Sequence, residues 1–124
     1  AIFLQVVPVS GTPLAFNWWR TGRILRLQLT GRARQGMSKE RLVVIGNGMA
    51  GVRTVEELLK LEGAARYAIT IIGDEPYGNY NRILLSPVLA GENTLDDIIL
   101  NTPEWYEENG IELIAGVTAV RIDR

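Results

Sequence analysis

A complete G-x-G-x-x-G pattern occupies six consecutive positions: Gly46, Asn47, Gly48, Met49, Ala50 and Gly51. Gly46 is expected to make a tight turn, and Gly48 to leave room for a pyrophosphate against the backbone. Gly51 would let a following helix pack close to the preceding strand. The start of that helix, at Met49 and Ala50, would offer free N–H groups and a partial positive charge to phosphates. The pattern therefore predicts a dinucleotide-binding turn.

A carboxylate is the second group that such a site needs, because it can accept hydrogen bonds from both ribose hydroxyls. Asp74 and Glu75 lie about twenty residues beyond Gly51, the spacing that is typical of this motif. One carboxylate is enough, and Asp74 is preferred because it lies closer to the expected strand end. Its charge would repel a 2′-phosphate, which argues against NADP at this position. The alternative is that both acids are solvated loop charges.

The segments around the glycine motif predict the elements that would position it. Residues 42–45 and 67–72 are short apolar, β-branched runs, typical of buried parallel strands. Residues 49–61 predict a helix ended by Gly63 as a C-cap glycine. Its expected buried positions are Val52, Val55, Leu58, Leu59 and Leu61, and its expected water-facing positions are Glu56, Glu57 and Lys60. This strand–turn–helix–strand context makes the glycine pattern far more specific than it is alone.

Residues 73–81 predict a polar loop, followed by two short helices. Ser86-Pro87 and Thr102-Pro103 have the composition of helix starts, and Gly91 and Asn109-Gly110 that of helix stops. Two further strands are expected at 111–114 and 117–122. Strands that alternate with helices predict an α/β fold with a parallel sheet.

The charges change sharply along the chain. Residues 1–36 contain five arginines and no acid, whereas residues 37–124 contain eight basic and fourteen acidic residues. We interpret 1–36 as a leader, either foreign to the protein or disordered, with one weak strand at 24–29. We interpret 37–124 as the N-terminal part of a nucleotide-binding domain. The alternative for the leader is an arm that binds a membrane surface or a partner through Trp18, Trp19 and its arginines.

Composition excludes several classes of function. A net charge of −1 gives no reason to expect nucleic acid as a partner. The chain has no cysteine and no histidine, so it offers neither thiol chemistry nor the usual zinc ligands. The apolar run at 1–14 is broken by Pro8, Gly11 and Pro13, and it is too short to span a membrane. Redox chemistry would therefore need a bound organic cofactor or protein outside this sequence, and we predict no catalytic residue and no metal ligand.

Residues 37–124 resemble the beginning of FAD-dependent pyridine nucleotide-disulfide oxidoreductases. Within that group they are most similar to the N-terminal flavin domain of NAD(P)H-dependent nitrite reductase large subunits. The resemblance is carried by residues 42–51, more specifically by 73–86 (GDEPYGNYNRILLS), and more weakly by Trp105-Tyr106 with 109–111. It implies a Rossmann-like FAD-binding domain that is incomplete in this chain.

The resemblance also implies roles for single residues. The three glycines would hold the FAD pyrophosphate and Asp74 the adenosine ribose. Arg82 would lie along the FAD near its phosphate and ribose, a role that suits its fixed charge and forked donors. Ser86 would lie near the flavin, although helix capping explains it equally well. Pro87 replaces a lysine that ferredoxin reductase-like relatives often have, whereas nitrite reductases often have proline.

The resemblance implies that the parent protein is a cytoplasmic flavoprotein and leaves open a homodimer. It would pass electrons from NAD(P)H through FAD to a metal centre or a partner protein. Iron–sulfur and sirohaem centres would belong to downstream domains, and this part alone would not be active. The alternatives are a ferredoxin or rubredoxin reductase-like flavoprotein and a non-catalytic dinucleotide-binding module. A second glycine motif beyond Arg124 would favour the oxidoreductase over that module.

Overall fold

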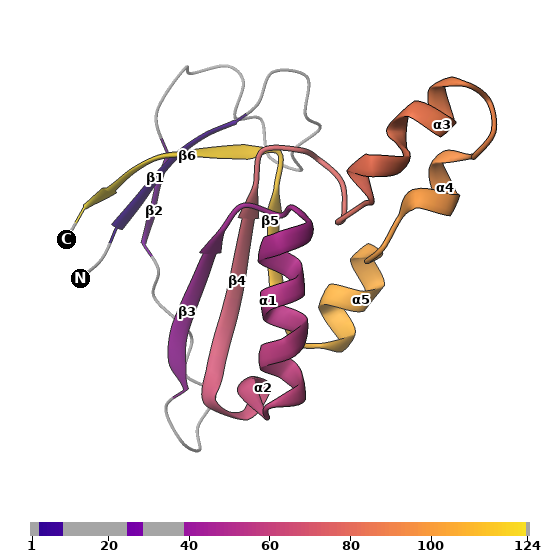
Figure 1. The fold of residues 1–124 in the computed structure, drawn as a ribbon. Coiled ribbons are helices and arrows are strands. Elements are labelled where there is room, and N and C mark those ends of the chain that lie inside the picture. Colours follow the sequence, from indigo (N-terminus) through magenta and orange to yellow (C-terminus); the bar gives the residue numbers. More distant parts are fainter. Residues whose placement is uncertain (1–2, 9–24, 29–38, 124) are drawn as a thin grey trace.

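The computed structural model of the chain describes residues 3–8, 25–28 and 39–123 (Figure 1). Its centre is a parallel sheet in which Leu42 lies opposite Ile69 and Ile45 lies opposite Ile72. The expected α/β fold with a parallel sheet is therefore confirmed. The strand order is β3-β4-β5, with β3 at Glu40–Ile45, β4 at Tyr67–Gly73 and β5 at Glu112–Ala115.

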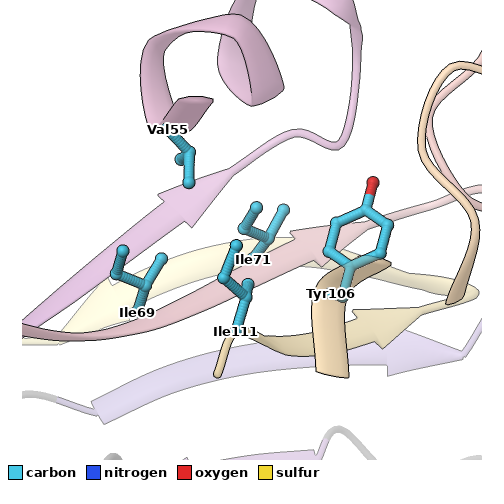
Figure 2. Packing of buried hydrophobic residues seen from close by; sticks show 5 residues of the cluster. All are labelled: Val55, Ile69, Ile71, Tyr106 and Ile111. Carbon is cyan, nitrogen blue, oxygen red and sulfur yellow. The ribbon is translucent and has the colours of Figure 1, made fainter. Parts of the chain in front are cut away.

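Helix α1 (Met49–Lys60) covers one face of this sheet. Val52 and Val55 are buried on its inner face, as expected. Figure 2 shows Val55 above Ile69 and Ile71 of β4, with Tyr106 and Ile111 beside them in the same cluster. Burial of a side chain of this size contributes about 1.5–3 kcal/mol relative to leaving it exposed, so this cluster holds α1 against the sheet.

The end of α1 differs from the sequence-based expectation. Leu61 is 78% exposed and caps the helix instead of belonging to its buried face. Glu62, with φ of 60°, takes the left-handed conformation that was expected at Gly63. Gly63 instead begins the short helix α2 (Gly63–Arg66), and a Cβ there would overlap Leu58. Glycine is therefore needed at 63 for close packing and not for its backbone angles.

The segment after β4 folds into four short helical elements beside the sheet (Figure 1). The expected N-cap at Ser86 is wrong, because the helix begins two residues earlier, with Leu84 as its N-cap, and continues directly from a 3-10 turn. Asn81 caps that turn, since its side-chain oxygen accepts a hydrogen bond from the Ile83 N–H at 3.1 Å. The elements are η2 (Arg82–Leu84), α3 (Leu85–Leu89), α4 (Leu95–Ile98) and α5 (Pro103–Glu108).

The other boundaries in this segment follow local signals. Thr102 is the N-cap of α5 and Pro103 its first residue, as expected. Gly91 and Gly110 have φ of 78° and 66°, so both stop signals are confirmed. Helix α4 was not expected; it is held by a reciprocal capping box between Thr94 and Asp97.

A second, antiparallel sheet includes part of the expected leader. Its order is β2-β1-β6, with β1 at Phe3–Pro8, β2 at Leu25–Gln28 and β6 at Val117–Asp123. In Figure 2, β1 and α1 lie on opposite sides of β3 and β4. The expected strands at 24–29 and 117–122 are confirmed as β2 and β6.

Strand β1, within the expected leader, hydrogen-bonds along one edge of β6. That residues 1–36 are foreign to the protein stays a prediction, and Trp18 and Trp19 lie outside the described residues. Within the part of the chain that the structure describes, no helix is long and apolar enough to cross a membrane.

We expect a shortened protein that starts at Met37 to keep the parallel sheet and α1 but to unfold at a lower temperature. Removal of β1 leaves the paired edge of β6 open, while the hydrogen bonds of β3, β4 and β5 involve none of the removed residues. The midpoint temperature of thermal unfolding should fall by about 5–10 °C, and unfolding should remain cooperative. Loss of cooperative unfolding would show that the leader is essential to the fold.

Candidate functional site

A cleft of about 440 Å³ lies where β3 and β4 end and α1 begins. This is the edge at which open α/β sheets bind ligands, outside the carboxyl ends of the strands. The cleft unites the predicted site residues except Ser86. Its lining consists of Ile45, Gly46, Asn47, Gly48, Met49, Ala50, Gly51, Asp74, Glu75 and Arg82.

Each glycine of the motif has a distinct geometry. Gly46 has φ of 111°, and its N–H donates to the Ile72 carbonyl oxygen at 2.7 Å, which ties the turn to β4. Gly48 has ordinary angles, but apart from its chain neighbours and the backbone of α1 no described atom lies within 4 Å of the position that its Cβ would take. A Cβ on Gly51 would lie 2.7 Å from the Gly46 carbonyl oxygen. The tight turn, the open approach and the close helix packing expected from the sequence are therefore all present.

The start of α1 is suited to an anion. Gly48 is its N-cap and provides no side-chain hydrogen bond, and the first turn contains no acidic residue. The first N–H groups of any α-helix lack partners within the helix and carry a partial positive charge. Here the residues that bear them, Met49 and Ala50, line the cleft. An anion in the cleft would meet backbone donors and no competing carboxylate from α1.

The two acids after β4 have different surroundings. The Glu75 carboxylate accepts hydrogen bonds from Arg82 at 2.8 Å and from the Tyr80 hydroxyl at 3.2 Å. Burial, and then the hydrogen bond to Glu75, raise the pKa of Tyr80. Asp74 is exposed and forms no hydrogen bond or ion pair with the described residues. Asp74 is thus the acid that remains free for a ligand.

Arg82 lies at the cleft with its guanidinium 5.7 Å from the centre of the Tyr80 ring. Together with the ion pair to Glu75, this contact holds its charge at the cleft. Ser86 lies on exposed α3 and is not among the residues that line the cleft. The structure therefore does not bring Ser86 to the other predicted site residues.

Sequence reasoning missed a set of buried polar side chains behind the glycine turn. The Asn47 side-chain oxygen accepts a hydrogen bond from the Tyr106 hydroxyl at 2.8 Å. Glu56, expected to face water, is partly buried and accepts from Asn101 at 3.0 Å. Helical periodicity cannot reveal this partner, because Asn101 reaches Glu56 from a loop 45 residues away. Within the described residues, no group of acidic side chains could hold a metal ion.

We expect Gly51→Ala to destabilise the fold by about 1–3 kcal/mol, because the new methyl group would press on the backbone carbonyl oxygen of Gly46. Gly48→Ala is the matched control, since its methyl group would enter open space. It should change the free energy of unfolding by less than about 1 kcal/mol, the scale of an N-cap change. Urea unfolding of both variants measures the difference, and equal losses would contradict the packing role of Gly51.

Comparisons with known proteins agree with this geometry. The chain is 56% identical over 87 residues to the assimilatory nitrate reductase electron transfer subunit of Bacillus subtilis, which covers 70% of this chain and 11% of that protein. It is 52% identical, with the same coverage, to the nitrite reductase [NAD(P)H] of the same organism. The chain thus spans about one ninth of the length of these two relatives.

Solved structures show the same fold. NADH:rubredoxin oxidoreductase from Clostridium acetobutylicum matches with a TM-score of 0.50 and 30% identity, over 64% of this chain and 20% of that one. The covalent putidaredoxin reductase–putidaredoxin complex matches with a TM-score of 0.55 and 28% identity, over 64% and 19%. The family model described as pyridine nucleotide-disulphide oxidoreductase matches residues 40–124. The chain belongs to the pyridine nucleotide-disulphide oxidoreductase family.

Proposed function

We propose that the cleft binds the adenosine diphosphate half of FAD. The observation that carries this proposal is the open space beside Gly48, directly in front of an uncapped helix start. A phosphate placed there would accept hydrogen bonds from backbone N–H groups and interact favourably with the helix dipole. The donors of this cleft therefore fit a pyrophosphate.

The other cleft residues suit the remaining groups of the adenosine diphosphate half of FAD. Asp74 is free to accept hydrogen bonds from the two ribose hydroxyls. Arg82 would contact a phosphate or the ribose from the opposite side, oriented by its ion pair with Glu75. Ser86 would contact the flavin only through a part of the cofactor that extends beyond this cleft.

The choice of FAD over NAD rests on similarity and not on the geometry of the cleft. The resemblance of residues 73–86, together with the nitrite reductase and electron transfer subunit among the relatives, favours a flavoprotein. When bound, FAD supplies the hydride and electron chemistry. The residues of this chain bind and orient the cofactor, and none of them needs to transfer a proton.

For the whole protein we propose an NAD(P)H-dependent oxidoreductase, of the kind found as the large subunit of nitrite reductase. It would pass electrons from NAD(P)H through FAD to a metal centre or a partner protein. The described residues contribute one cleft of that path. The nicotinamide site and the electron acceptor would lie in other parts of the protein, with iron–sulfur and sirohaem as the candidate centres.

Gly48→Val should weaken FAD binding on the order of a hundredfold or more, because a branched side chain would fill the space that the pyrophosphate needs. Ala68→Val is the matched control, since it introduces the same branched side chain at an exposed position of β4. Quenching of flavin fluorescence during titration measures both affinities. Equal FAD affinity in the two variants would refute the phosphate-binding role of the glycine turn.

Asp74→Asn should lower FAD affinity by roughly tenfold to a hundredfold, because a charged acceptor of ribose hydrogen bonds is lost. Glu75→Gln should change it less than about threefold, since the glutamine amide oxygen can still accept a hydrogen bond from Arg82 and the exposed ion pair contributes little. The same titration separates the two acids. A larger effect at Glu75 would mean that the ribose carboxylate has been assigned to the wrong residue.

A further inference from the structure

A single hydroxyl group connects the two sides of the cleft. The Tyr106 hydroxyl donates to the Asn47 side-chain oxygen at 2.8 Å and accepts from the Asn79 backbone N–H at 3.1 Å. Tyr106 is 1% exposed, and its ring packs in the core beside Ile71 and Ile111 (Figure 2). The hydroxyl is therefore carried on a side chain that the core holds rigidly.

On one side of the cleft, the hydroxyl holds the glycine turn. Asn47 lies between Gly46 and Gly48, and its amide nitrogen donates to the Tyr77 carbonyl oxygen at 3.1 Å. Gly73 packs so closely on Asn47 that a Cβ on Gly73 would lie 2.7 Å from the Asn47 Cβ. Both polar atoms of the Asn47 side chain are thus used to anchor the turn, one to Tyr106 of α5 and the other to the loop after β4.

On the other side, the same hydroxyl holds the loop that carries Arg82. Asn79 is 3% exposed, and its carbonyl oxygen accepts from the Leu100 and Asn101 N–H groups at 2.9 and 3.1 Å. Its side-chain nitrogen donates to the Asn101 side-chain oxygen at 2.9 Å, and Asn101 in turn donates to Glu56 of α1. The network therefore returns to the helix whose first turn lines the cleft.

We propose that Tyr106 is a positioning residue for the dinucleotide site. Its hydroxyl fixes the glycine turn, through Asn47, relative to the segment at 79–82, so that the backbone donors and Arg82 line one cleft. The identity of the ligand in this inference rests on the proposed function. The hydrogen bonds of Tyr106 do not, because the chain forms them without a ligand.

The chemistry of the hydroxyl supports this role. Burial raises the pKa of Tyr106, so the group keeps the proton that it donates to Asn47. Removal of the hydroxyl would leave the Asn47 oxygen and the Asn79 N–H without this shared partner. A buried polar group without a hydrogen-bond partner costs far more free energy than an exposed one. The glycine turn and the segment at 79–82 would therefore shift toward water or another partner.

Tyr106→Phe in the 124-residue chain tests the proposal, because it removes the hydroxyl and keeps the ring. In the ligand-free protein, amide hydrogen exchange should rise about tenfold at residues 46–49 and 77–82. FAD affinity, measured by titration, should fall about tenfold. Asn47→Ala removes the same hydrogen bond together with the one to the Tyr77 carbonyl oxygen, so it should raise exchange at the same two segments, with less than additive effects in the double variant.

Thr70→Val is the matched control. It removes one side-chain hydrogen bond, from Thr70 to Glu112 at 3.0 Å, between β4 and β5 and away from the cleft. It should leave amide exchange in both cleft segments and FAD affinity unchanged.

The outcomes separate this inference from the proposed function. Unchanged exchange at both segments in Tyr106→Phe and Asn47→Ala would overturn the positioning role, and so would an equal rise throughout the chain. If exchange rises at the two segments but the unmodified chain binds no FAD, the positioning role stands and the proposed function fails. If the chain binds FAD and Tyr106→Phe binds it equally well, the positioning role fails.

Discussion

The site depends on one close contact, the approach of α1 to the glycine turn that precedes it. At Gly51 a Cβ would lie 2.7 Å from the Gly46 carbonyl oxygen, so the helix can begin at this point only because no side chain intervenes. That contact directs the first turn of α1 into the cleft. The backbone donors of the site are then held by packing in the core, where Val55 meets Ile69 and Ile71.

The part of the cleft that Arg82 lines is built from polar interactions. Arg82 is oriented by Glu75 and Tyr80, while Asp74, one residue before Glu75, has no partner among the described residues. Neighbouring acids thus differ in their partners, and only the Glu75 carboxylate is held by other described side chains. The buried hydroxyl of Tyr106 joins this part to the glycine turn, so the spacing of the cleft is set by a hydrogen bond within the protein.

Local patterns in the sequence predicted the elements that position the site. The β-branched runs, the three glycines and Thr102-Pro103 depend on neighbouring residues, and the structure agrees with each of them. The failures came from competing or distant partners. Asn81 starts a 3-10 turn ahead of Ser86 and moves the helix start, while Asn101 covers Glu56 from a distant loop. Tyr106 and Asn47 lie 59 residues apart in the sequence, so periodicity could not reveal their hydrogen bond.

The most direct test of the account is an amide chemical-shift titration of the isotope-labelled chain with FAD. The account predicts the largest shifts at Gly48, Met49, Ala50 and Asp74, with little change along β6 and α4. Adenosine diphosphate should shift the same amides, since it contains the half of FAD that the cleft is proposed to bind. Saturable shifts elsewhere, with the glycine turn unaffected, would contradict the central claim.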